Sequence, residues 1–114
     1  MAFETTVTVP GDKQTYIFNP NMRKYALTDL GFITNNAGTY VMERALQPMK
    51  GLQASIKLKV MVDKNLTGIK IKTMNPAGND RVDIFKNPDN AEMVELYNYY
   101  LNELVSRDVI KIAE

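Results

Sequence analysis

The stretch ASIKLKVMVDKNLTGIKIKT, residues 54–73, decides the fold, because apolar and polar residues alternate along both of its halves. A period of two is the pattern of β-strands that bury one face. Six apolar residues fall on the face that the two halves share: Ile56, Leu58, Val60, Val62, Ile69 and Ile71. The intervening residues Asp63–Leu66 favour a turn. The stretch therefore predicts an antiparallel hairpin with one face on the core.

Shorter strands are predicted on both sides of this hairpin. Pro10-Gly11-Asp12 and Asn35–Gly38 supply the residues of two turns. The segment Tyr25–Leu27 is too short to assign. The remaining predicted strands cover residues 3–9, 15–18, 31–34, 39–42 with an extension toward 46, 81–85 and 108–112.

One long helix is predicted near the C-terminus. Asn87 fits the N-cap and Pro88 the first helical position, and the helix is expected to run to about Arg107. Its apolar stripe covers about 180°, broader than the ~100° stripe of a surface helix, so strands are expected on more than one side of it. The stripe consists of Met93, Val94, Leu96, Tyr97, Tyr100, Leu101, Leu104 and Val105. These elements predict an α+β fold of antiparallel hairpins and sheets packed around a single long C-terminal helix.

The composition restricts the chemistry available to the chain. Its 114 residues suit one domain, residues 1–114. Cysteine and histidine are absent, which excludes thiolate catalysis and removes the commonest general base and metal ligand. No carboxylate pair or serine has the context of a catalytic site, so no catalytic residue, metal site or cofactor is predicted. A binding protein is therefore favoured over an enzyme.

Charge is distributed unevenly, although the net charge is only +1. Residues 39–79 carry seven cations and two anions, a net charge of +5, whereas residues 80–114 carry four cations and eight anions, a net charge of −4. Such opposite regions can neutralise each other within one molecule or between two copies, so monomer and homodimer both stay open. No apolar run approaches the ~20 residues of a membrane span, and the N-terminus lacks signal-peptide character. A cytoplasmic protein without membrane association is expected.

The register of the central hairpin brings its lysines together. A two- or four-residue loop would place Lys59 opposite Lys70 and Lys57 opposite Lys72, and directly opposed like charges are destabilising. We call these four residues the lysine face. It predicts a site for an anionic small molecule or an acidic protein partner. The alternative is an ordinary solvated surface, or a face that the protein's own acidic residues neutralise. Nucleic acid is unlikely as a partner because the face lacks arginine and interleaved aromatic residues.

Tyr99 is a second candidate contact residue. On the predicted helix it lies opposite the apolar stripe, on a face formed by Glu92, Glu95, Asn102, Glu103 and Ser106. An exposed tyrosine is a frequent anchor at interfaces. Its alternative is a side chain that simply lies along its own helix.

Four segments resemble a small family from lactic-acid bacteria and their relatives that carries an amino-acid-metabolism label. They are FETTV followed by Pro10-Gly11, KYAL at 24–27, DLGF at 29–32, and LYNYYL at 96–101. The resemblance implies a cytoplasmic α+β domain of strands around one helix, with a metabolic role. The resulting hypothesis is an accessory or ligand-binding protein linked to amino-acid metabolism, without covalent catalysis. Two alternatives stay open: a small enzyme using lysine and carboxylate chemistry on an amino-acid or nucleotide-like metabolite, and a nucleic-acid-associated protein using the lysine face.

Overall fold

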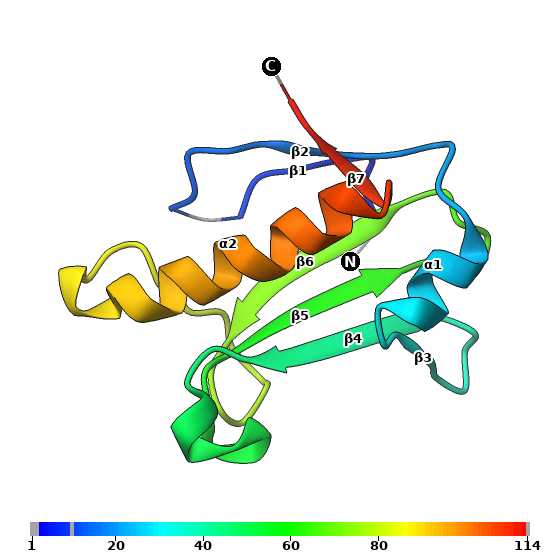
Figure 1. The fold of residues 1–114 in the computed structure, drawn as a ribbon. Coiled ribbons are helices and arrows are strands. Elements are labelled where there is room, and N and C mark those ends of the chain that lie inside the picture. Colours follow the sequence, from blue (N-terminus) through cyan, green and yellow to red (C-terminus); the bar gives the residue numbers. More distant parts are fainter. Residues whose placement is uncertain (1–2, 10, 114) are drawn as a thin grey trace.

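Helix α2, Ala91–Ser106, lies between two antiparallel sheets (Figure 1). The computed structural model describes residues 3–9 and 11–113. One sheet has the order β3-β4-β5-β6 and consists of Ile33–Thr34, Tyr40–Ala45, Lys57–Val62 and Ile69–Met74. The other has the order β1-β2-β7 and consists of Thr6–Val7, Tyr16–Phe18 and Ile110–Ile112. The predicted α+β arrangement around a single long helix is confirmed.

The alternating pattern of β5 and β6 places their side chains as predicted. Leu58, Val60 and Val62 of β5 and Ile69 of β6 have no exposed surface. They belong to one core cluster with the buried face of α2 and with residues of the smaller sheet. Each such side chain contributes roughly 1.5–3 kcal/mol of gross burial free energy. The hairpin and α2 therefore form the centre of the core.

The predicted register of this hairpin is wrong by two residues. Lys59 lies opposite Lys72, whereas Lys70 lies opposite Met61 and Lys57 opposite Met74. A shift of two keeps every side chain on its predicted face and changes only its cross-strand partner. The like-charge contact therefore exists, but between a different pair of lysines.

The longer connection between β5 and β6 explains this shift. The loop covers residues 63–68 and is held by the Asp63 carboxylate, which accepts hydrogen bonds from the backbone amides of Thr67 at 2.6 Å and Gly68 at 3.2 Å. The Thr67 hydroxyl donates a third hydrogen bond to the same carboxylate. These bonds lower the pKa of Asp63 against the opposing effect of its burial, which is the largest single influence. A side-chain-stabilised six-residue loop replaces the tighter turn that the sequence favoured.

Helix α2 begins as predicted. The Asn87 side chain accepts a hydrogen bond from the Asp89 amide at 2.9 Å, and a 3₁₀ turn, Pro88–Asn90 (η3), leads into the helix. The helix ends at Ser106, one residue before the expected end. Its most deeply buried side chains are Met93, Tyr97, Leu101 and Leu104. No helix among the described residues is long and apolar enough to cross a membrane.

Two shorter segments differ from the expectation. Lys24–Asp29, in which no element was assigned, forms the short helix α1. The predicted strand at 81–85 is wrong: Arg81 forms an isolated bridge to Met74, and no strand covers these residues. The chain then turns, because the Asp83 carboxylate accepts a hydrogen bond from the Phe85 amide at 2.8 Å. The apolar alternation of this segment reflects a packed loop, in which Ile84 is fully buried.

The N-terminal segment links the two sheets. Glu4 and Ile69 exchange two backbone hydrogen bonds at the edge of β6, and the chain then enters β1. A Cβ atom on Gly68 would lie 2.9 Å from the Cβ of Phe3, so the crossing requires a residue without a side chain. This contact covers part of the β6 edge and protects it from pairing with another chain.

Candidate binding surfaces

The outer face of the larger sheet holds the cluster of basic side chains. Lys59 lies between Glu43 of β4 and Lys72 of β6, directly opposite each. Lys70 is two residues before Lys72 on the same strand, and its Nζ lies 4.4 Å from the centroid of the Phe3 ring. Lys59, Lys70 and Lys72 are each partly exposed. The structure thus brings three of the four predicted lysines together on one accessible surface.

Lys57 differs from the other three lysines. It occupies the same side of β5, between Ala45 and Met74, but only 8% of its surface is exposed. The Lys57 side chain can therefore add positive charge to this surface, but it offers little area for contact with a partner. Arg81, which sequence reasoning did not include, joins the cluster through its bridge to Met74. Because the sequence predicted a strand at 81–85 that does not form, it did not predict that Arg81 lies near these lysines.

The charges of this surface act on one another. Partial burial lowers the pKa of Lys72, and the positive charges of Arg81, Lys70 and Lys59 lower it further, in that order. In the described part of the chain, none of the lysines 59, 70 and 72 has a carboxylate oxygen within 4.0 Å, whereas Arg107 and Asp29 form an ion pair at 2.8 Å. The lysines of this surface therefore repel one another, and Glu43, the cross-strand neighbour of Lys59, forms no ion pair with them.

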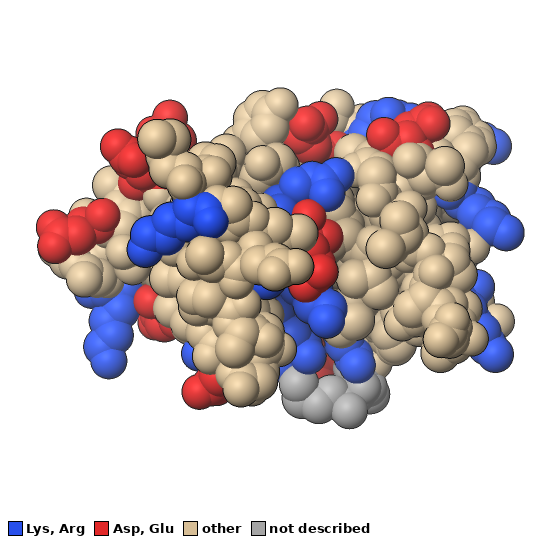
Figure 2. Space-filling view, turned by 90° about the horizontal axis from the view of Figure 1, so that it is seen from below, with Lys and Arg blue, Asp and Glu red and all other residues tan. Residues whose placement is uncertain are grey.

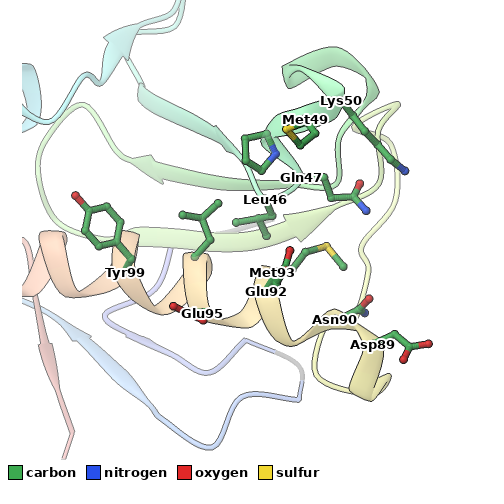
Figure 3. A pocket seen from close by; sticks show the side chains of 12 residues that line it. Leu46, Gln47, Met49, Lys50, Asp89, Asn90, Glu92, Met93, Glu95 and Tyr99 are labelled. Atoms are coloured by element: carbon green, nitrogen blue, oxygen red, sulfur yellow. The ribbon is translucent and has the colours of Figure 1, made fainter.

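Tyr99 lies elsewhere, at one end of a groove of about 830 Å³ along α2 (Figure 3). The opposite wall is the 3₁₀ turn Pro48–Lys50 (η1), and Figure 3 shows Lys50 and Asp89 at the far end. Apolar side chains line this groove together with carboxylates from η3 and α2: Leu46, Met49, Met93, Leu96, Asp89, Glu92 and Glu95. Tyr99 is 56% exposed, and a hydrogen bond with Glu103 raises the pKa of its phenol. The structure does not bring Tyr99 together with the lysine face.

The side of the molecule that faces downward in Figure 1 carries both positive and negative side chains. Figure 2 shows Lys and Arg side chains interspersed with Asp and Glu side chains on that side of the molecule. A strongly basic stripe, which is the usual electrostatic footprint of nucleic-acid binding, is not seen in this view. Within residues 3–9 and 11–113, no group of three metal-ligating side chains is placed to hold an ion.

These features define a small α+β domain with a helix between two antiparallel sheets and a basic outer sheet face. The chain belongs to the DUF1831 family, described as "Putative amino acid metabolism", whose model matches residues 1–111. It is similar to a DUF1831 family protein from Lactobacillus plantarum, known from a crystal structure at 1.20 Å resolution. The two are 41% identical over 99% of each chain, with a TM-score of 0.90. The comparison with curated proteins finds no match.

These findings confirm the family resemblance that the sequence suggested.

Proposed function

We propose that this protein is a cytoplasmic accessory protein of amino-acid metabolism that docks an acidic protein partner on the lysine face and performs no covalent catalysis itself. The observation that carries this proposal is the directly opposed pair Lys59 and Lys72, which has no carboxylate within 4.0 Å among the described residues. Opposed like charges reduce stability, so an anionic partner would relieve a cost that the free protein bears. The family description supplies the metabolic context.

The shape of the surface favours a protein partner over a small anion. Small molecules bind in concave sites that enclose most of their surface. Lys59, Lys70 and Lys72 line neither the groove along α2 nor the two other cavities described among these residues, and each is partly exposed on the outer sheet face. Electrostatic complementarity across such a face mainly accelerates association and sets specificity.

The spacing of the lysines suggests how an acidic segment would bind. Opposed side chains such as Lys59 and Lys72 have Cβ atoms about 5 Å apart, and Lys70 and Lys72 are separated by roughly 7 Å along β6. Alternate residues of an extended chain have the same separation of roughly 7 Å. An extended segment with a carboxylate at every second position therefore matches the spacing of Lys70 and Lys72 along β6.

Affinity purification from cells that naturally contain the protein tests this proposal. The wild type is compared with the double variant Lys59→Glu/Lys72→Glu and with the matched control Lys24→Glu/Lys86→Glu, which changes the charge equally at two exposed residues elsewhere. Circular dichroism must show that all three proteins are fully folded under the conditions of the purification. We expect an acidic protein of amino-acid metabolism to be lost with the first variant and retained with the control. Identical partners for all three proteins would contradict the proposal.

A further inference from the structure

A second cavity, of about 540 Å³, lies between α2 and the smaller sheet. Its walls come from the loop after β1, from β2 and β7, from Phe85, and from one flank of α2. The lining includes Asp12, Lys13, Tyr16, Phe85, Asn98 and Asn102. None of them was a predicted site residue, because Asp12 and the helix meet only in the folded chain. We call this cavity the Asp12 pocket.

The Asp12 carboxylate is held in a fixed position in this pocket. One oxygen accepts a hydrogen bond from the Tyr97 hydroxyl at 2.7 Å, and the other accepts one from the Gln14 amide at 3.0 Å. Tyr97 has no exposed surface, so its hydroxyl contacts Asp12 from the core side of the pocket. Burial raises the pKa of Tyr97, and its hydrogen bond to Asp12 raises it further. The phenol therefore stays protonated and remains a donor at physiological pH.

In the part of the chain that the structure describes, this carboxylate forms no ion pair, although Lys13 lines the same pocket. Within the described residues, Asp12 has no Lys or Arg nitrogen within 4.0 Å. Asp12 is half-buried, and among the described residues its negative charge is stabilised by two hydrogen-bond donors but by no cation within 4.0 Å. A cation that enters the pocket would add a charge–charge attraction to these hydrogen bonds.

Aromatic side chains line the same pocket. Tyr16 is 3% exposed, and burial raises its pKa to about 12, with a further contribution from the charge of Asp12. The Phe85 ring packs edge-on against Tyr97, with ring centroids 5.2 Å apart, which fixes its position. Neutral aromatic rings attract organic cations when these approach a ring face. A carboxylate beside aromatic walls suits an ammonium group better than a hydrated metal ion.

We propose that the Asp12 pocket binds a small molecule through a primary ammonium group, with Asp12 as the counter-ion. Asn98 and Asn102 lie one turn apart on α2 at this pocket, and Lys13 lines it as well. These side chains offer hydrogen-bond donors to a second polar group on the same ligand, such as a carboxylate. An amino acid and the amine formed by its decarboxylation share the ammonium group, and only the amino acid uses this second contact. The site is independent of the lysine face, and neither proposal requires the other.

Nuclear magnetic resonance titration of the full chain tests this site. Three kinds of probe are added at neutral pH: pools of free amino acids, pools of the corresponding decarboxylated amines, and N-acetylated amino acids other than lysine, which lack the ammonium group. We expect saturable shifts of the backbone amides of residues 11–14, 98 and 102 with one or both of the first two kinds of pool, and none with the third. If no pool produces such shifts, or if the N-acetylated compounds bind equally well, the proposal is wrong.

Variants then assign the contacts. Asp12→Asn keeps an oxygen that accepts from Tyr97 but removes the charge, and it should weaken binding at least about tenfold. Glu92→Gln, which makes the same charge change on the groove side of α2, should bind as the wild type does. Asn98→Ala/Asn102→Ala alters only exposed side chains, and it should weaken binding of the amino acid but leave the amine unaffected. Wild-type affinity in Asp12→Asn would overturn the proposal.

Discussion

Lys72→Glu reverses the charge of a lysine whose neighbours are three cations. Lys59 lies directly opposite it, Lys70 is on the same strand, and the charge of Arg81 acts on it most strongly of the three. A cross-strand pair contributes roughly 0.2–1 kcal/mol, favourable for opposite charges and unfavourable for like charges. The substitution turns the unfavourable Lys59 contact into a favourable one. Because solvent screens the smaller contributions, we expect the free energy of unfolding to rise by about 0.5–1 kcal/mol.

Lys59→Glu is the comparison variant, because the two cross-strand neighbours of residue 59 carry opposite charges. Residue 59 lies between Glu43 and Lys72, so a glutamate there gains one favourable contact and creates one unfavourable contact. The two changes largely cancel, and we expect its free energy of unfolding to stay within about 0.5 kcal/mol of the wild type. The difference between the two variants therefore reports the contact of residue 59 with Glu43.

Urea unfolding at pH 7 and low ionic strength measures the free energy of unfolding of both variants. A change in stability should shift the unfolding midpoint and leave the m-value unchanged. The difference between them should shrink at ~1 M salt, where the Debye length is about 3 Å. A clear loss of stability in Lys72→Glu would refute the reasoning. It would mean that Lys72 already has an acidic partner in the folded protein.

Three further predictions concern the core, the helix cap and the tyrosines. Leu101→Asp places a carboxylate where no surface is exposed, so circular dichroism should show an unfolded chain, and a native melting temperature would be inconsistent with this helix face. Asn87→Ala removes the hydrogen bond to the Asp89 amide and should lower the free energy of unfolding by ~1 kcal/mol in urea titrations, whereas an unchanged midpoint would mean that the cap contributes nothing. Stability should vary little from pH 6 to 8, because the chain has no histidine. Above pH 10, the unfolded state loses the Tyr16 proton that the folded state retains to about pH 12, so stability should fall as pH rises, and it should fall less in Tyr16→Phe.

The elements with strong periodicity were predictable from sequence. In β5 and β6 the period of two decides which side chains are buried, and it holds whatever the register. In α2 the broad apolar stripe correctly indicated coverage on two sides, and the Asn87 cap marked its start. In each case many residues of one segment follow the same pattern of burial, so the prediction does not depend on any single residue.

The features that depend on single tertiary contacts were not predictable. The register follows from one carboxylate, Asp63, which closes a loop of six residues. The Asp12 pocket depends on a hydrogen bond between residues 85 positions apart, and no local pattern signals such a contact. Arg81 was placed on a strand that does not form, which concealed its proximity to Lys72. The pattern of lysines in the sequence was therefore enough to find a candidate surface. Which residues belong to that surface could be seen only in the folded chain.

Titration with a defined acidic peptide tests the proposed docking surface most directly. A peptide with glutamate and serine in alternation provides carboxylates at the spacing of alternate residues in an extended chain. The account predicts that this peptide shifts the amide resonances of Lys59, Lys70 and Lys72 at low salt. It also predicts that Lys59→Glu/Lys72→Glu abolishes these shifts and that Lys24→Glu/Lys86→Glu does not. Binding that maps to another surface, or that survives in Lys59→Glu/Lys72→Glu, would contradict it.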